Sequence, residues 1–404
     1  MFLSKESLFG FLFLVGLSVG ALSYFESSMA VRFFIGLAFG FSLVRASIGF
    51  AGSVNKLYRA HSATVAKTII WIFIVTSIFM AFLMNGHESS YKLSIYPINL
   101  GLMLGGIMFG FGMAMSSCCA TGSLTDLSSG FSRAAVTIFF FCFGVFLGFS
   151  TQANAPFVKE SFISSETGLL SKGGVFLPDY FRFDGFNGYL GAVLTTVVLG
   201  LLAIKVAEYF DKTEQESSQG KEELDLFEKV FVKAWKMYVS VFIISSLFAF
   251  LFYFSHKGWG ASSALGIWFG KFTMLFGVDA QMLSAFTSKK SELFMNPLTS
   301  HATSVQNIGI ILGAVVALMI AGMFSKKFVA GLKITPKGAM TFAFGGFIMG
   351  VGTRLSNGCN VGALYTPIAE FSLSGWIYLV FVVMGGVLGN MFVKRFISPT
   401  CSVV

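Results

Sequence analysis

Residues 105–122 read GGIMFGFGMAMSSCCATG, and residues 345–362 read GGFIMGVGTRLSNGCNVG. The two stretches agree at several glycines, at one serine and at one cysteine, so that Cys119 and Cys359 stand 240 positions apart (359 − 119 = 240). A glycine-rich segment that twice delivers a thiol to the same relative place indicates a symmetric site built from two halves.

The composition around this repeat is that of a membrane protein. Of the 404 residues, 55% are hydrophobic and only 12% are charged, and the mean hydropathy is +0.78. A soluble domain carries about 25% charged residues. Apolar stretches close to the length of roughly 17–25 residues that a transmembrane helix needs occur near 8–25, 66–84, 133–150, 187–205, 234–255, 306–324 and 375–392.

Charge and cysteine usage exclude several classes of protein. The net charge of +9 comes from basic residues in loops beside the spans, which predicts membrane topology rather than nucleic-acid binding. The cysteines are five in number, and none lies in a loop that we place outside, which argues against a disulfide framework. There is no CxxC pair, and the four histidines lack ligand spacing, so we expect neither a metal site nor a cofactor.

The chain divides into two membrane halves. Residues 1–205 form the first half with one extra span, residues 206–233 form a charged linker with a flexible centre at 213–220, and residues 234–404 form the second half. A second repeat supports this division, because Gly36-Leu-Ala-Phe-Gly40 matches Gly266-Ile-Trp-Phe-Gly270.

These features predict an all-α polytopic membrane protein. Crowded glycines make poor continuous helices, so we expect each glycine-cysteine segment to be a pair of broken or re-entrant half-helices that line a cavity. The same small residues also allow close helix packing, and we expect both uses of the glycines together. With about nine crossings, an outside N-terminus and an inside C-terminus, the basic loop 326–337 is inside and the halves form an inverted repeat.

The two cysteine segments are the candidate site. Serine and asparagine favour helix N-caps, and a helix N-terminus attracts anions, although it contributes only about 0.3–1 kcal/mol. A buried anion therefore needs further donors or a cation, for which Arg45 and Arg354 are the intramembrane candidates. Thiols are soft, polarisable groups, which favours a sulfur-bearing anion. The candidate residues are Cys119, Cys359, Cys118, Gly49, Arg45, Arg354, Ser116, Ser117, Asn357 and Gly358.

These motifs resemble those of the YeeE/YedE family of bacterial inner-membrane sulfur transporters. The resemblance is carried by Gly36 to Arg45, by 106–122 and by 346–362, with Phe371-Ser-Leu-Ser-Gly-Trp376 close to the YedE-type members. It implies thiosulfate uptake, with the ion passed along cysteines of which Cys119 and Cys359 match two. The family's Arg-x-x-Phe-Cys motif reads Arg45-Ala-Ser-Ile-Gly49 here, so glycine replaces the third cysteine.

The sequence therefore predicts a permease, not an enzyme, that passes a small sulfur-containing anion through a thiol-lined constriction in the bacterial inner membrane. A selenium species is an alternative substrate, since YedE-like members are linked to selenium metabolism. A membrane thiol enzyme or persulfide carrier built on Cys118-Cys119 is the alternative from another class, but neither a histidine nor a lysine stands in the motif to activate a thiolate. The expected partners are the anion, the lipid bilayer and a cytoplasmic sulfur-acceptor protein, without nucleic acid.

Overall fold

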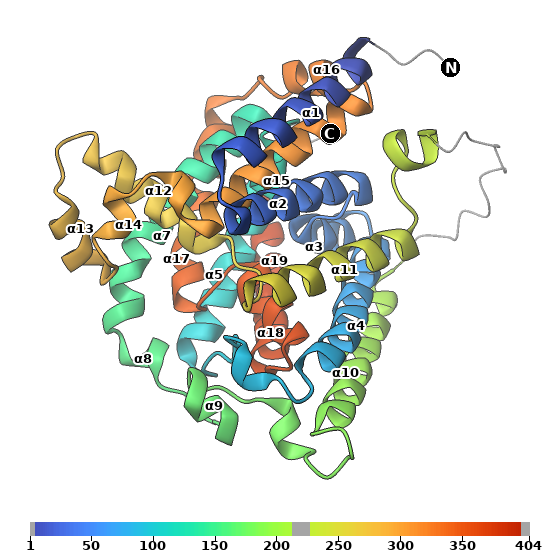
Figure 1. Cartoon of the computed structure of the whole chain (residues 1–404), viewed down its shortest axis with the longest axis vertical. Coiled ribbons are helices and arrows are strands. Elements are labelled where there is room, and N and C mark those ends of the chain that lie inside the picture. Colours follow the sequence, from blue (N-terminus) through green and yellow to red (C-terminus); the bar gives the residue numbers. More distant parts are fainter. Residues whose placement is uncertain (1–4, 212–226, 397–404) are drawn as a thin grey trace.

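The computed structural model describes residues 5–211 and 227–396, which are almost entirely helical (Figure 1). Within these residues there is no β-strand, only two isolated bridges, Lys92 to Lys257 and Phe176 to Ser372. The predicted flexible centre of the linker at 213–220 and Cys401 lie outside the described residues. The longer helices are α1 (Lys5–Tyr24), α2 (Ser27–Ala46), α3 (Phe50–Arg59), α4 (Thr64–Met84), α5 (Leu100–Ser116), α7 (Phe131–Asn154), α10 (Tyr189–Tyr209), α11 (Met237–Ser255), α12 (Ser262–Met274), α15 (Ala302–Ile320), α17 (Pro336–Leu355) and α19 (Leu373–Phe396). The shorter ones are η1 (Glu88–Ser90), α6 (Ala120–Asp126), α8 (Pro156–Lys159), α9 (Glu166–Ser171), η2 (Leu177–Tyr180), η3 (Glu228–Val232), α13 (Ala280–Thr287), α14 (Glu292–Met295), η4 (Leu298–Ser300), α16 (Phe324–Ala330), η5 (Asn360–Tyr365) and α18 (Thr366–Ala369).

Nine helices in the described part of the chain are long and apolar enough to cross a membrane, which confirms the all-α polytopic fold. Seven of them, α1, α4, α7, α10, α11, α15 and α19, cover the spans predicted from sequence. The other two are 100–126, which holds the first glycine-cysteine segment, and 27–59, which the sequence interpretation did not treat as a span. The span over α2 was missed because Gly36 and Gly40 interrupt its apolar run.

The glycines of these helices mark places where two backbones touch. A Cβ atom added to Gly36 or Gly40 of α2 would collide with the carbonyl oxygens of Gln306 or Ile310 on α15. Gly313 of α15 meets the carbonyl of Leu37 in the same way. Small residues allow this approach, which replaces the hydrophobic driving force that lipid does not supply.

The same close packing forms the centre of the molecule, where α5 crosses α17. A Cβ on Gly105 would lie 2.7 Å from Ser356 N, and one on Gly345 would lie 3.0 Å from Ser116 N. Here the prediction of glycine-broken helices was wrong in detail: α5 and α17 run unbroken through their glycines to Ser116 and Leu355. The breaks follow the glycines instead, at the serine-cysteine segments.

The second predicted repeat is used differently in its two copies. Gly36 and Gly40 pack against the backbone of α15, whereas Gly266 and Gly270 of α12 face the aromatic side chains of Phe149 and Phe294. The sequence match at these positions therefore does not correspond to matching contacts.

The start of α1 lies beside α16 (Figure 1), where the Glu6 carboxylate accepts a 2.9 Å hydrogen bond from the backbone N–H of Ser325. The sequence analysis put the N-terminus outside and the loop 326–337 inside. These two assignments are incompatible, because Glu6 and Ser325 are in contact. A crossing by α2, which was not counted in the predicted topology, reverses the side on which α1 begins.

Candidate functional site

The first break in the fold brings Cys119 to the start of a new helix. Helix α5 ends at Ser116, Ser117 adopts a left-handed conformation (φ 56°), and α6 begins directly after Cys119. The Ser116 hydroxyl is within hydrogen-bonding distance of the carbonyl oxygens of Gly112 (2.8 Å) and Cys118 (3.0 Å), which fixes the turn. Cys119 Sγ accepts from the N–H of Gly122 at 3.3 Å, so the thiol itself caps α6.

The second break repeats this geometry. Helix α17 ends at Leu355, Asn357 is left-handed (φ 62°), and the π-helical turn η5 begins directly after Cys359. The Ser356 hydroxyl lies 2.8 Å from the carbonyl of Gly352 and 3.1 Å from that of Gly358. The predicted N-caps, Ser117 and Asn357, are therefore corrected: these residues make the turn, and the cysteines occupy the N-cap positions because the turn consumes two more residues.

The two thiols lie near each other in the protein interior. Cys119 and Cys359 are 2% and 1% exposed, and they are close enough to interact electrostatically. The fully buried Tyr378 of α19 lies close to both. Tyr378 was not among the predicted site residues, because it lies just outside the quoted motif that ends at Trp376.

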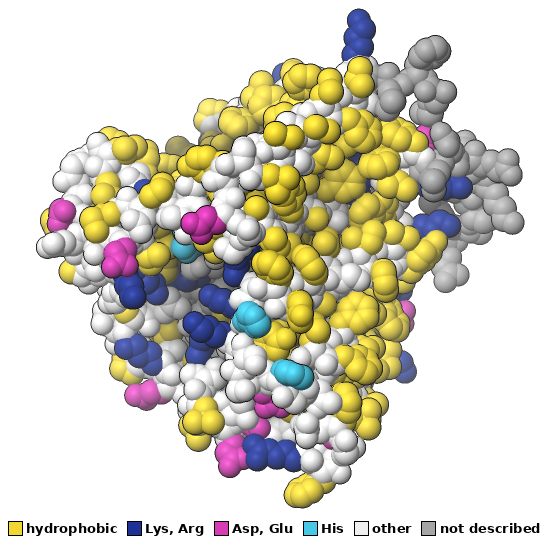
Figure 2. Space-filling view, viewed as in Figure 1, with side chains coloured by type: hydrophobic (Ala, Val, Ile, Leu, Met, Phe, Trp, Pro, Cys, Tyr) yellow, Lys and Arg dark blue, Asp and Glu magenta, His cyan; other side chains and the backbone are white. Residues whose placement is uncertain are grey.

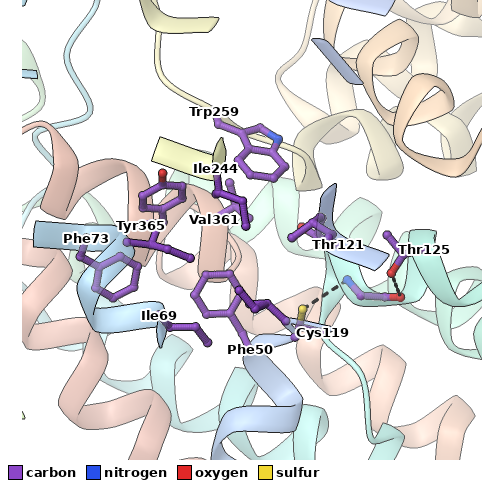
Figure 3. A pocket seen from close by; sticks show the side chains of 15 residues that line it. Phe50, Ile69, Phe73, Cys119, Thr121, Thr125, Ile244, Trp259, Val361 and Tyr365 are labelled. Carbon is purple, nitrogen blue, oxygen red and sulfur yellow. Dashed lines mark hydrogen bonds between the residues drawn. The ribbon is translucent and has the colours of Figure 1, made fainter. Parts of the chain in front are cut away.

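A cavity of about 30 Å³ opens beside Cys119 (Figure 3) and is also lined by Gly49. Thr121 and Trp259 also line it, and the Thr121 hydroxyl and the Trp259 indole N–H are buried without a hydrogen-bond partner in the described residues. This volume admits about one or two water molecules, so a larger ligand fits only when side chains such as Phe50 and Trp259 move. The cavity thus brings together Cys119, Gly49 and two residues, Thr121 and Trp259, that carry unpartnered polar atoms.

Arg354 is held inside the protein without a carboxylate. It is 4% exposed, its Nη2 donates to Ser262 Oγ at 2.6 Å, and it forms no salt bridge among the described residues. Its guanidinium lies 5.3 Å from the ring centroid of Phe149, and the ammonium of Lys289 lies 4.9 Å from the same centroid. Arg354 is therefore a buried cation rather than one that extends to an interface.

Lys289 adds a second positive charge beside Arg354, at the ring of Phe149. Burial lowers the pKa of Lys289, and the neighbouring charges of Arg354 and Lys172 lower it further. Figure 2 shows Lys and Arg side chains gathered around a hollow between the α12–α14 region and the α8–α9 region. Sequence reasoning missed Lys289 because its partners are distant along the chain.

The remaining predicted residues have other contacts. Arg45 Nη1 donates to the carbonyls of Phe231 and Val232, both at 2.7 Å, and so ties α2 to the end of the linker. Cys118 does not line the cavity; its Sγ lies 3.1 Å from Ser123 Oγ. Asn357 Oδ1 accepts from Gln152 Nε2 at 2.8 Å. Gly358 has no room for a Cβ, which would lie 2.7 Å from the amide nitrogen of Ala363.

One buried carboxylate was missed. Glu370, three residues before α19, is 0% exposed and was not among the predicted site residues. The only sequence signal is a single acidic residue in the otherwise uncharged stretch 355–393.

Comparisons with known proteins agree with this architecture. A model of the Sulphur transport family matches residues 45–388. The thiosulfate transporter TsuA of Spirochaeta thermophila is 24% identical over 365 residues, covering 87% of this chain and 94% of that protein. TsuA of Escherichia coli is 21% identical over 354 residues, covering 87% and 90%. The probable transporter YedE of Escherichia coli is 29% identical over 170 residues, covering 40% and 38%. The chain, a multi-pass membrane protein by its helices, thus belongs to the Sulphur transport family.

Proposed function

We propose that this protein is a permease that carries a small sulfur-containing anion such as thiosulfate across the bacterial inner membrane, past Cys359 and Cys119. The observation that carries the proposal is the pair of buried, mutually close thiols at two matching breaks in the fold. The relatives named as thiosulfate transporters, which align with 87% of the chain, support the choice of substrate.

The polar groups along this route reduce the free-energy cost of burying an anion in a membrane. Burying an unpaired anion in a hydrocarbon-like medium costs tens of kcal/mol, whereas a helix N-terminus returns at most about 2 kcal/mol. Arg354 and Lys289 supply fixed positive charge at one end of the route, and the Thr121 hydroxyl and Trp259 N–H supply donors beside Cys119. Each thiol then acts as a weak, polarisable hydrogen-bond partner of the anion between the cationic pair and these two donors.

The proposed topology differs from the one expected from sequence. We assign the end that holds the basic loop 326–337 to the cytoplasm, by the positive-inside rule, which places the start of α1 there as well because of the contact between Glu6 and Ser325. Lys289 then lies on the outer side, against that rule. Its position beside Arg354 accounts for the exception, because a positive mouth attracts anions. The matched contacts of α5 and α17 support an inverted repeat.

Replacing Arg354 with glutamine is expected to reduce thiosulfate uptake into proteoliposomes about 10-fold or more, because a hydrogen bond to a charged group contributes about 1.5–3 kcal/mol.

Lys289→Gln is expected to raise the KM several-fold with a smaller effect on the maximal rate, and its effect is expected to shrink at high salt. The matched controls are Lys290→Gln, at the exposed neighbour, and Arg182→Gln, at an exposed ion-paired arginine. Equal uptake by Arg354→Gln and by the controls would remove Arg354 from the route.

Restoring the third thiol is expected to improve transport. Gly49 has extended backbone angles (φ −141°, ψ 131°), and a Cβ built on it comes no closer than 4.0 Å to another heavy atom. A Gly49→Cys variant should therefore fold normally and lower the KM for thiosulfate several-fold. In a Cys118→Ala background, mild oxidation should join the new thiol to Cys119, which lines the same cavity.

The control for this experiment is Gly52→Cys, at an equally open position on α3 that is not part of the cavity lining. We expect no cross-link and an unchanged KM for that variant. If Gly49→Cys behaves like Gly52→Cys in both measurements, position 49 is not a station on the route.

A further inference from the structure

Glu370 is a buried carboxylate that the route described above does not use. Its Oε2 accepts a hydrogen bond from the backbone N–H of Ser94, and its Oε1 is buried without a partner in the described residues. The side chain is 0% exposed and forms no salt bridge in the described part of the chain. Such a carboxylate is costly when ionised, so burial favours the protonated form.

The position of Glu370 connects it to both parts of the proposed route. The helical segment that begins after Cys359 runs through η5 and α18 and ends at Glu370, and α19, which carries Tyr378, begins three residues later. On the other side, a Cβ on Gly258 would collide with Glu370 Oε1, and the neighbouring Trp259 carbonyl accepts a 2.7 Å hydrogen bond from Thr366. A change of charge at Glu370 therefore acts on the joint between the Cys359 segment and the loop that holds Trp259.

Other titratable groups near this joint are few and mostly cationic. Lys172 and Lys257 are the charged residues that act on Glu370. His301 lies near Lys257, and burial lowers its pKa, as do the charges of Lys257, Lys271 and Arg32, so that it stays neutral at neutral pH. Tyr91 stands between Phe252 and His256 in an aromatic stack. A second carboxylate lies close by, since Glu88 accepts a 2.8 Å hydrogen bond from the Tyr189 hydroxyl, and Tyr189 packs against Phe371, the chain neighbour of Glu370. Glu370 is the fully buried one of the two.

The membrane potential opposes the entry of a dianion, and a proton-binding group can reduce this cost. Moving one elementary charge against a membrane potential of 100 mV costs about 2.3 kcal/mol, so an inward-moving dianion costs about 4.6 kcal/mol. A proton that travels with the anion removes one of the two charges from this cost. It also adds about 1.4 kcal/mol of driving force for each unit of pH difference.

We propose that Glu370 is the proton-binding site of an anion–proton symport. In each cycle the Glu370 carboxylate takes one proton from the outer solution while the anion occupies the thiol segment, and it returns that proton to the cytoplasmic side when the anion leaves. Protonation cancels the charge at the joint, which allows α18 and the 258–259 loop to shift together. The proposal rests on the proposed function, because it assumes a transported anion.

The test uses the full-length protein in proteoliposomes with the membrane potential clamped at zero. With a pH difference of about one unit, alkaline inside, the wild type is expected to accumulate radiolabelled thiosulfate about tenfold, because one proton enters with each anion. Thiosulfate added outside should also acidify a pH dye trapped in the vesicles. A Glu370→Gln variant should exchange labelled for unlabelled thiosulfate at equal concentrations but should neither accumulate it nor move protons.

Two control variants separate Glu370 from other groups. Glu166→Gln, at an exposed carboxylate, and His301→Gln, at the titratable neighbour, are both expected to retain accumulation and proton uptake. If Glu370→Gln does not fold, Glu370→Asp supplies the comparison, since it keeps a carboxylate and should keep the proton-linked accumulation at a lower rate.

The outcomes distinguish the two proposals. Proton-linked accumulation that persists in Glu370→Gln, or that disappears in His301→Gln, overturns the role of Glu370. Exchange by the wild type without any response to the pH difference overturns symport and leaves the permease intact. Absence of both exchange and uptake in the wild type overturns the permease, and the symport with it.

Discussion

Replacing Cys359 or Cys119 with alanine is expected to reduce the initial rate of thiosulfate uptake at least about tenfold for each variant. Alanine keeps the small apolar volume at the helix start but removes the thiol that contacts the anion on the proposed route. Loss of a hydrogen-bond partner for a charged group costs about 1.5–3 kcal/mol, and each 1.4 kcal/mol in the barrier is a factor of ten in rate. Because the thiols act in series, we expect the double variant to be about as slow as the slower single variant.

The measurement is uptake of radiolabelled thiosulfate into proteoliposomes containing equal amounts of each variant. Cys142→Ala is the matched control, since Cys142 is buried in α7 and does not line the cavity. Cys118→Ala is a stricter control, because Cys118 is adjacent in sequence but interacts with Ser123. Uptake that falls equally in all four variants would indicate a packing defect, and uptake unchanged in Cys119→Ala and Cys359→Ala would exclude a role for the thiols.

The second large effect concerns stability rather than transport. Gly110→Val is expected to destabilise the protein by about 1–3 kcal/mol or more, because a Cβ at this position would collide with the carbonyl oxygen of Val382 and lie 2.7 Å from Gly386 N. Both atoms belong to the backbone of α19 and cannot move aside independently. The α5–α19 contact would have to open, and the serine-cysteine turn that follows α5 would move with it.

This prediction is checked by the thermal transition of purified protein, followed by size-exclusion chromatography. Gly350→Val should behave similarly, since a Cβ there would lie 2.8 Å from Val145 N on α7. Gly16→Val is the control, because Gly16 of α1 has no heavy atom within 4 Å of its Cβ position. A transition temperature of Gly110→Val equal to that of Gly16→Val would contradict the close-packing interpretation.

Comparison of sequence and structure shows where local information was sufficient. The duplicated motif located both breaks within a few residues, because a left-handed turn after a helix and a thiol two residues later are encoded by neighbouring residues. The motif did not predict the N-cap residues correctly. Ser117 and Asn357 are residue types that favour N-caps, but here they adopt the left-handed conformation of the turn. The sequence interpretation also did not predict α2 as a membrane span, although its glycines belong to an unbroken helix that packs on α15.

The sequence by itself determined that the chain lies in a membrane, that a thiol segment occurs twice, and that glycines allow close helix contacts. These features follow from composition and repetition, which can be read directly from the linear sequence. Only the tertiary structure decided that Cys119 rather than Cys118 lines the cavity, that Lys289 and Arg354 share the ring of Phe149, and that Glu370 is buried without a salt bridge to any described residue. These facts depend on which distant segments touch. The contacting residues are separated in the sequence by 60 to more than 200 positions. Such contacts follow from backbone packing at the helix crossings, and no local sequence pattern predicts them.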